Sequence, residues 1–224
     1  MKNLIALTLV LVAAMTGCAK LRGGAPKSEE DKTLYALGMI IGKNLGDFNL
    51  TERELDIVKS GMTDVVQGKK TAVDLETYGP KVDKLHSDRR TARGAAEKKK
   101  GVAFVEGAAR ESGAVKTPSG AVVRTTKPGT GPNPQPTDRV QVHYTGKLID
   151  GTVFDTSRKP GGQPVTFPLN GVIKCWTEGV GQMKVGEQAV ITCPSEIAYG
   201  EMGQRNIPPN ATLIFDVELI SIPK

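Results

Sequence analysis

Few residues of this sequence could take part in bond-making chemistry. The chain has three cysteines and two histidines. A nucleophilic cysteine needs a base within hydrogen-bond reach, and a zinc site needs ligands at characteristic spacings. His143 lies between Val142 and Tyr144, and neither Cys175 nor Cys193 has a histidine near it in the sequence. We therefore predict neither a Cys–His catalytic centre nor a metal site.

Cys175 and Cys193 have a second interpretation. Outside the cytosol the two residues could form a disulfide. A disulfide depends on the distance between the two Cα atoms, which the sequence does not give. Our expectation is therefore that both cysteines are buried as free thiols.

A stretch suited to an apolar binding site runs from Val140 to Phe215. Aromatic and branched apolar residues are interleaved there with glycine and proline. Val140, Val142 and Tyr144 alternate with polar residues, which is the period of a half-buried strand. The pattern predicts a strand-rich domain around an apolar pocket.

Turn, helix and strand signals give the order of elements in this domain. Asp150-Gly151 predicts a hairpin turn, because glycine readily adopts a positive φ. We predict a short helix around residues 175–180 and a loop at Pro208-Pro209, since proline cannot join a central strand. A final strand is predicted from Thr212 to Ile220. One face of that strand carries Leu213, Phe215, Val217 and Leu219.

Six motifs occur in order between about residue 117 and residue 223: V-H-Y-T-G, D-G-x-x-F-D-x-S, V-I-x-x-W, M-x-V-G-E, A-Y-G and I-P-P-N-A-T-L-I-F-D-V-E-L. With these motifs the sequence resembles the FKBP-type peptidyl-prolyl cis/trans isomerases. The resemblance implies an α+β fold, in which a twisted antiparallel β-sheet wraps around a short helix at 114–224. It implies no cofactor, proline-containing exported proteins as substrates, and inhibition by macrolides of the tacrolimus type.

The resemblance also implies the residues of the pocket. The expected catalytic set is Tyr144, Phe154, Asp155, Trp176, Tyr199 and Phe215. The expected substrate-binding set is Val165, Val172, Ile173 and Ile207. Asp155 is expected at the pocket edge, and Phe167 and Leu169 are expected to be core residues only.

Each member of the pocket has an implied role. Trp176 would form the floor under the proline ring, and Phe154 and Phe215 would form walls. The Ile173 backbone N–H and the Tyr199 hydroxyl would bind substrate carbonyls. Isomerisation of an X-Pro bond breaks no covalent bond, and its barrier of roughly 18–20 kcal/mol comes from lost amide resonance. Apolar walls and a few hydrogen-bond donors therefore suit this reaction.

A chaperone or assembly module is the alternative function. Two pockets on long connectors could hold an unfolded client bivalently and raise avidity without fast catalysis. The retained Asp155, Trp176 and Tyr199 favour the isomerase.

Residues 1–17 are predicted to be a lipoprotein-type signal peptide. Its apolar core from Leu4 to Met15 is too short for a membrane span. Met15-Thr16-Gly17-Cys18 resembles the bacterial lipobox, with Met in place of the usual Leu. This implies cleavage before Cys18, a lipid anchor on Cys18, and a periplasm-facing site at the outer membrane. An ordinary secretory signal is the alternative. Residues 18–28 are predicted to be a flexible tether.

The region from 29 to 113 has helical periodicity, and Thr51 with Glu54 predicts a capping box at a helix start. We predict a helical dimerisation domain at 29–79 and, at 80–113, a polar connecting helix that bridges domains rather than packing in a core, with a break or kink at Gly79-Pro80.

Three motifs occur in this region: K-x-x-Y-x-x-G-x-x-x-G from Lys32, G-M-x-D from Gly61 and K-G-x-A-F from Lys100. With them the region is similar to the front domain of macrophage infectivity potentiator-like isomerases, which implies a homodimer through about residues 29–70.

The positive charge does not indicate nucleic-acid binding. The formal net charge is +6. Its clusters, Arg89-Arg90 and the lysines at 98–100, lie in helix-prone sequence. A solvated helix face explains such clusters, so we expect no nucleic-acid partner.

Overall fold

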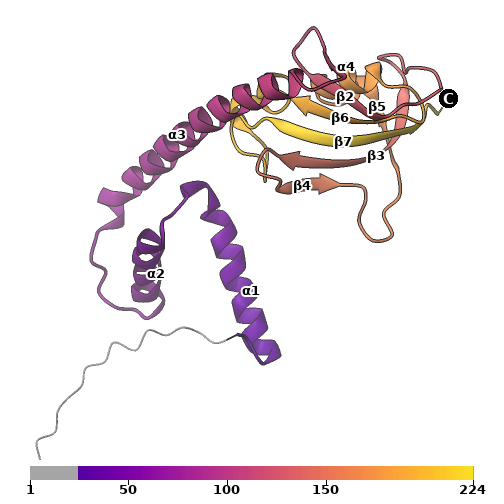
Figure 1. The fold of residues 1–224 in the computed structure, drawn as a ribbon. Coiled ribbons are helices and arrows are strands. Elements are labelled where there is room, and N and C mark those ends of the chain that lie inside the picture. The colour runs from indigo at the N-terminus through magenta and orange to yellow at the C-terminus, as the bar shows by residue number, and fades with distance from the viewer. Residues whose placement is uncertain (1–24, 224) are drawn as a thin grey trace, which may run out of the picture. The chain divides into compact units, whose positions relative to one another are not determined.

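The computed structural model describes residues 25–223 (Figure 1). Contacts divide the chain into two compact units, Met1–Gly46 and Asp47–Lys224. Within the described residues no helix combines the length and the apolar character needed to cross a membrane. Cys18 and the predicted signal peptide lie outside the described residues.

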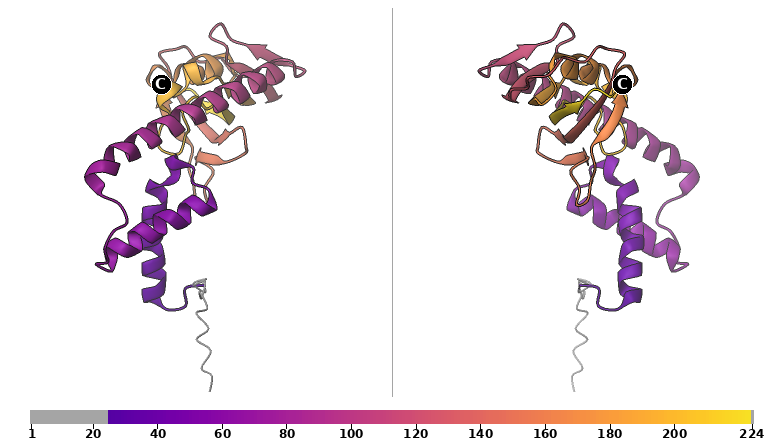
Figure 2. Two further views of the ribbon diagram at one scale, coloured as in Figure 1. Left: turned by 90° about the vertical axis from the view of Figure 1, so that its left-hand side faces the viewer. Right: turned by 90° about the vertical axis from the view of Figure 1, so that its right-hand side faces the viewer.

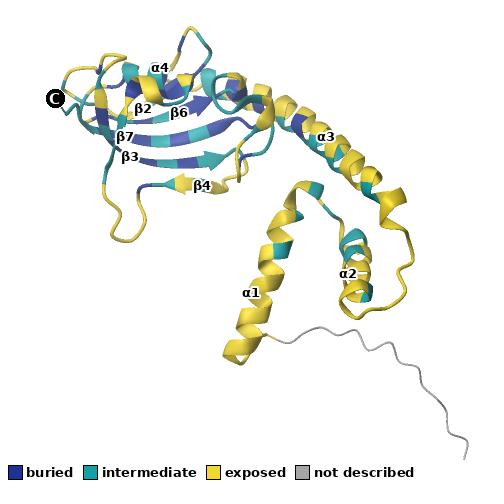
Figure 3. Ribbon diagram, turned by 180° about the vertical axis from the view of Figure 1, so that it is seen from behind, coloured by how far each residue is buried: buried dark blue, intermediate teal, exposed yellow. Residues whose placement is uncertain are grey.

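The first unit contains helix α1, Glu29–Asn44. Ser28 caps it: its hydroxyl accepts the Asp31 N–H, and the Asp31 carboxylate accepts the Ser28 N–H. This reciprocal capping satisfies two amides that a helix start otherwise leaves unpaired. No residue of α1 is buried, and Figure 3 shows the helix exposed over most of its surface.

A 3-10 turn at Gly46–Phe48 spans the boundary, and the second unit continues with helix α2, Glu52–Val66. The predicted capping box is confirmed, because Thr51 and Glu54 exchange the hydrogen bonds that start α2. Gly68 follows the helix with φ +63°, the left-handed conformation that ends helices.

Helix α3, Leu75–Ala109, is 35 residues long and has Pro80 inside it. At 1.5 Å per residue it is about 50 Å long. Of the break or kink predicted at Gly79-Pro80, the break is therefore wrong, and the kink stays a prediction. Pro80 lies six positions after the N-cap Asp74, so the ring removes one hydrogen bond close to the helix start. Its lost partner, the Glu76 carbonyl, belongs to an exposed residue and can be hydrated there.

An ion pair joins α3 to α2. The Arg89 guanidinium contacts the Glu54 carboxylate at 2.5 Å and donates to the Phe48 carbonyl at 2.8 Å. The Phe48 ring lies 5.0 Å from the His86 ring between centroids. These contacts hold the start of α2 against the middle of α3.

The C-terminal half of α3 packs on the β-rich part of the same unit (Figure 2). Gly94, Gly101 and Val105 are its buried residues. The polar composition of this helix led to the prediction that it bridges domains without packing. That expectation is wrong for this half, because Gly94 and Gly101 let the helix backbone approach closely and Val105 is buried beside them.

One antiparallel sheet forms the β-rich part, in the order β1-β2-β6-β7-β3-β4, with β5 paired to β3. Central strands β3 and β7 bury alternate residues, which confirms the predicted period of two. The predicted turn at Asp150-Gly151 has Gly151 at φ +87°. The strands are β1 Ala114–Lys116, β2 Val122–Lys127, β3 Arg139–Leu148, β4 Val153–Thr156, β5 Val165–Pro168, β6 Gln188–Cys193 and β7 Leu213–Ser221.

Helix α4, Lys174–Gln182, confirms the predicted short helix and packs over the sheet (Figure 1). Its buried residues Cys175, Trp176 and Val180 join the core formed by β3, β6 and β7. The core therefore lies between one helix and one concave face of the sheet.

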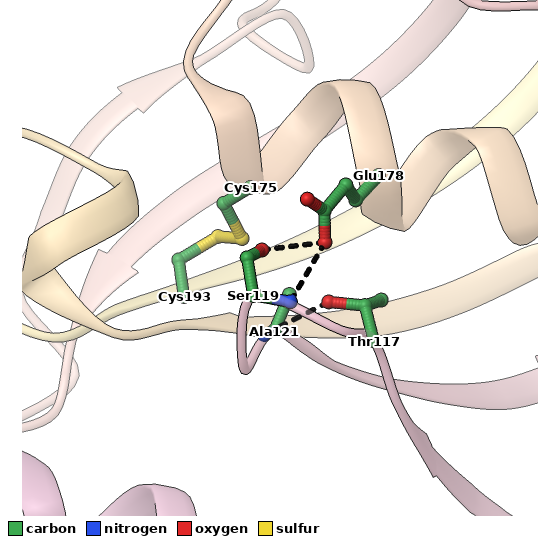
Figure 4. The surroundings of a disulfide bond; sticks show 6 residues. All are labelled: Thr117, Ser119, Ala121, Cys175, Glu178 and Cys193. Carbon is green, nitrogen blue, oxygen red and sulfur yellow. Dashed lines mark hydrogen bonds between the residues drawn. A yellow bond between two sulfur atoms is a disulfide. The ribbon is translucent and has the colours of Figure 1, made fainter.

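A disulfide joins α4 to β6 (Figure 4). Cys175 and Cys193 are both fully buried, and their Cα atoms lie 5.6 Å apart. The expectation of free thiols is therefore wrong, since 5.6 Å lies within the range that a disulfide spans. Beside the bridge, the Glu178 carboxylate accepts from the Ser119 N–H at 3.2 Å, which ties α4 to the turn before β2.

Candidate active site

A cavity of about 410 Å³ opens between the start of α4 and the sheet. Its lining comes from β3, β4, β5, β7, α4 and the loop that joins β6 to β7. The lining residues are Tyr144, Phe154, Asp155, Phe167, Gly171, Val172, Ile173, Trp176, Tyr199, Gln204 and Phe215.

Trp176 is the centre of the aromatic part. It is 4% exposed and lies in the first turn of α4. The Tyr144 and Phe215 rings each lie 5.3 Å from it between centroids, and the Phe167 ring lies 5.7 Å away. All three pairs are edge-to-face, the arrangement in which a positive ring edge meets a negative ring face. Phe154 extends the wall through an edge-to-face contact with Phe215 at 5.7 Å.

Polar groups occupy one side of the cavity. The Tyr144 hydroxyl donates to the Asp155 carboxylate at 2.5 Å, which fixes the ring of Tyr144. Burial first, and then this hydrogen bond, raise the pKa of Tyr144 above its ordinary value. Burial and the Asp155 charge also raise the pKa of Tyr199. Both phenols therefore stay protonated at neutral pH, and the Tyr199 hydroxyl can donate to a carbonyl.

The start of α4 supplies a backbone donor. Ile173 is the N-cap, and its carbonyl accepts from the Trp176 N–H at 2.8 Å and the Thr177 N–H at 3.2 Å. Among the described residues its own N–H has no hydrogen-bond partner. A helix-start N–H without a partner favours a carbonyl oxygen as its ligand.

Two of the expected substrate-binding residues lie outside this lining. Ile207 is buried and lines a second, adjoining cavity of about 310 Å³, together with Arg205 and Asn206. Val165 is half-buried on β5, opposite Val142, and packs against the core.

Phe167 was expected to be a core residue only, and this is wrong, since its ring lines the cavity. Leu169 is fully buried, as expected. The signal for Phe167 was present in the sequence: it lies two residues after Val165, so both share one face of β5. Gln204 and Gly171 complete the lining, and no local pattern marks either of them.

The residues that could have made covalent chemistry are engaged elsewhere. Nδ1 of His143 lies 3.0 Å from the Ser157 hydroxyl. Cys175 and Cys193 are bonded to each other. The cavity thus offers aromatic surface and hydrogen-bond donors to a ligand, and among the described residues neither cysteine presents a thiol to it.

Two protein-family models match the chain. The model for FKBP-type peptidyl-prolyl cis-trans isomerase matches residues 131–220. The model for the domain amino terminal to FKBP-type peptidyl-prolyl isomerase matches residues 30–122. Together they cover the described helices as well as the strands that form the cavity.

Relatives match over most of their length. An FKBP-type 22 kDa peptidyl-prolyl cis-trans isomerase of Escherichia coli is 40% identical over 86% of this chain and 95% of its own. The outer membrane protein MIP of Legionella longbeachae is 33% identical over 99% of this chain and 98% of its own. The crystal structure of FkpA from Escherichia coli superposes with a TM-score of 0.67 over 88% of this chain and 98% of its own, at 33% identity.

These matches agree with the geometry of the cavity and favour catalysis over the chaperone alternative. The aromatic cavity and the activity named for the 22 kDa relative of Escherichia coli describe an enzyme that accelerates X-Pro isomerisation. The chain belongs to the family of FKBP-type peptidyl-prolyl cis-trans isomerases.

Proposed function

We propose that the 410 Å³ cavity is the active site and that it acts by binding the twisted amide more tightly than the planar one. The proline ring stacks on Trp176, between Phe154 and Phe215. The Ile173 N–H and the Tyr199 hydroxyl bind carbonyls of the peptide. Asp155 orients Tyr144 and bears the one negative charge of the lining.

The physical basis is the loss of amide resonance. The planar amide is the more polar form, so apolar walls favour the twisted form in which the C–N bond has become single. Each 1.36 kcal/mol of such preference accelerates exchange about tenfold. The aromatic rings around Trp176 are the observation that carries this proposal.

Tyr199→Phe in the full chain tests the site. Loss of one hydrogen bond of about 0.5–1.5 kcal/mol should lower kcat/KM for an X-Pro peptide about two- to tenfold. Tyr35→Phe, an exposed tyrosine of α1, is the matched control and should be neutral. Equal activity of both variants with the wild type would remove Tyr199 from the site. Competition by a tacrolimus-type macrolide tests the same cavity with a ligand.

We further propose that the enzyme acts on exported proteins from a lipid anchor at Cys18. The lipobox-like sequence and the similarity to a protein named outer membrane protein MIP support an envelope location facing the periplasm. In cells, Cys18→Ala should leave an unprocessed or mislocated precursor. If this variant is processed and fractionates with the membrane as the wild type does, the anchor is elsewhere.

We also propose a homodimer through residues 29–70, with the isomerase domain at 114–224 outside the interface. An apolar groove of about 630 Å³ between α2, the following loop and the start of α3 supports it; Ile57, Met62, Val65, Val73 and Leu75 line the groove. A second copy is the proposed occupant. Its α1 would supply apolar residues that are exposed in this chain: Leu34, Tyr35, Leu37, Met39 and Ile40.

A further inference from the structure

The long loop between β6 and β7, residues 194–212, delivers part of the proposed active site. Tyr199 and Gln204 line the 410 Å³ cavity, and Ile207 lines the adjoining one. The loop is therefore one side of the proline-binding site. The position of the loop therefore sets the position of the Tyr199 hydroxyl.

The β6–β7 loop has a folded shape of its own. The Asn210 N–H donates to the Gly200 carbonyl at 2.8 Å, and the Gly203 N–H donates to the Tyr199 carbonyl at 3.2 Å. Gln204 and Ile207 exchange backbone hydrogen bonds at 3.0 and 2.6 Å. These hydrogen bonds connect Tyr199 and Gly200 to the rest of the loop, so a displacement of its outer side should also displace Tyr199.

Helix α3 makes polar contacts with that outer side. The Arg90 guanidinium donates to the Met202 carbonyl, in the middle of the loop, at 2.5 Å. The Lys98 ammonium lies 3.4 Å from the Glu196 carboxylate near the loop's beginning. Arg90 and Lys98 are distant from the loop in sequence, so only the fold brings them together.

Glycines of α3 make the close contacts. A Cβ added to Gly94 would lie 3.1 Å from Asn210 Nδ2 and 3.2 Å from Pro209 Cβ. A Cβ added to Gly101 would overlap the Thr212 hydroxyl, and Thr212 is buried. The helix backbone thus lies directly against the end of the loop.

The contacts share one face of the helix. Positions 90, 94, 98 and 101 are separated by four, four and three residues, which is the spacing of neighbours along one side of an α-helix. This face touches the loop at its beginning, at Met202 and at its end. A connector that served only as a spacer would need none of these contacts.

We propose that α3 from Arg90 to Gly101 is a positioning element of the active site, which holds the β6–β7 loop so that Tyr199 and Ile207 face the bound proline peptide. The proposal rests on the assignment of Tyr199 to the site. It makes this part of the helix a support of the active site and not a spacer alone.

Gly101→Ala in the full chain is the first test, with Gly107→Ala as its matched control. Both are glycines inside α3, but a Cβ at Gly107 meets nothing within 4 Å. Displacement of the loop by a fraction of an ångström should lower kcat about tenfold. The loss should appear in kcat more than in KM, because the aromatic walls that bind proline are unchanged. Gly107→Ala should stay within about twofold of the wild type.

Arg90→Ala is the second test, because removal of a surface side chain leaves the fold intact. It should lower kcat about two- to fivefold through one lost hydrogen bond. Arg90→Lys keeps a donor and should recover most of the loss. Lys99→Ala removes one exposed cation from the same helix and should have no effect.

The outcomes separate the two proposals. If Gly101→Ala and Arg90→Ala match their controls in kcat while Tyr199→Phe is impaired, α3 is a spacer and the positioning role is wrong. If Tyr199→Phe matches the wild type, the site assignment fails and the positioning role with it. Thermal unfolding of each variant, followed by circular dichroism, verifies that every assay is made on folded protein.

Discussion

Strand β7 and helix α1 carry comparable numbers of large apolar residues but differ in what covers them. In β7, Leu213 and Leu219 are fully buried, and Phe215 is 4% exposed. In α1, Leu34 is 60% exposed and Tyr35 is 62% exposed. Burial of apolar area is the main source of stability, at about 25 cal/mol per Å². The sheet thus obtains its stability within one chain, and α1 has apolar surface still to bury.

The two regions are therefore suited to different functions. The region with a filled core builds a fixed cavity, which catalysis by a shaped pocket requires. The region with exposed apolar residues is suited to association with a second chain. Matched substitutions in the two regions test this assignment.

The largest effect is expected for Phe215→Ala. Loss of a buried phenylalanine should lower the free energy of unfolding by about 3–5 kcal/mol and reduce isomerase activity. Tyr35→Ala in α1 should change the free energy of unfolding by less than about 0.5 kcal/mol, in protein dilute enough to be monomeric. Urea unfolding can be followed by fluorescence of Trp176, the one tryptophan of the chain. Equal effects of the two variants would contradict the comparison.

The second-largest loss of stability is expected on removal of the disulfide. Cys175 and Cys193 are 18 residues apart, and replacing both by Ala should lower the free energy of unfolding by about 3 kcal/mol. Isomerase activity should stay within a few-fold, since isomerisation uses no nucleophile. With reductant present throughout, wild type and variant should unfold at similar urea concentrations. A large loss of activity in the folded variant would argue for a catalytic role of sulfur.

Gly42→Leu should weaken dimerisation by about 1–3 kcal/mol through overpacking. In the single chain a Cβ at Gly42 meets nothing within 4 Å, so the cost arises only against a second copy. Gly107→Leu is the control outside the proposed interface. Light scattering should show a dimer for wild type and control and more monomer for Gly42→Leu, with peptide isomerisation unchanged. A monomeric wild type at tens of micromolar would reject the dimer.

The smallest effect is expected at the contact between α2 and α3. The Arg89 guanidinium, followed by the Thr51 N–H, lowers the pKa of Glu54 from 4.5 to about 2. Because the folded-state pKa is the lower one, the stabilisation is present above pH 4.5 and is lost as pH falls through about 2. Titration of the Glu54 carboxyl by NMR measures this pKa directly. An ordinary pKa would mean that Arg89 does not bind Glu54 in solution.

Local signals in the sequence predicted much of this fold. The alternation in β3 and β7, the turn at Gly151 and the capping box at Thr51 all depend on residues close together in the chain. The ordered motifs indicated the cavity for the same reason, since each motif lies on one strand, turn or helix start.

What the sequence did not predict depends on distances through space. The pairing of Cys175 with Cys193 needs α4 docked on β6. The contact of Gly101 with Thr212 needs α3 docked on the β6–β7 loop. The prediction for Pro80 assumed the usual effect of proline, which interrupts a helix interior. Its position near an exposed helix start makes the lost hydrogen bond tolerable.

The disulfide also bears on how the chain matures. Three cysteines allow three different pairs, 18 with 175, 18 with 193 and 175 with 193, and the structure contains the last of these. A sulfur that has entered a thioether with lipid can no longer exchange with a disulfide. The proposed lipidation of Cys18 would therefore leave Cys175 and Cys193 as the two thiols that can still be oxidised. Attachment of the lipid would then favour the correct disulfide.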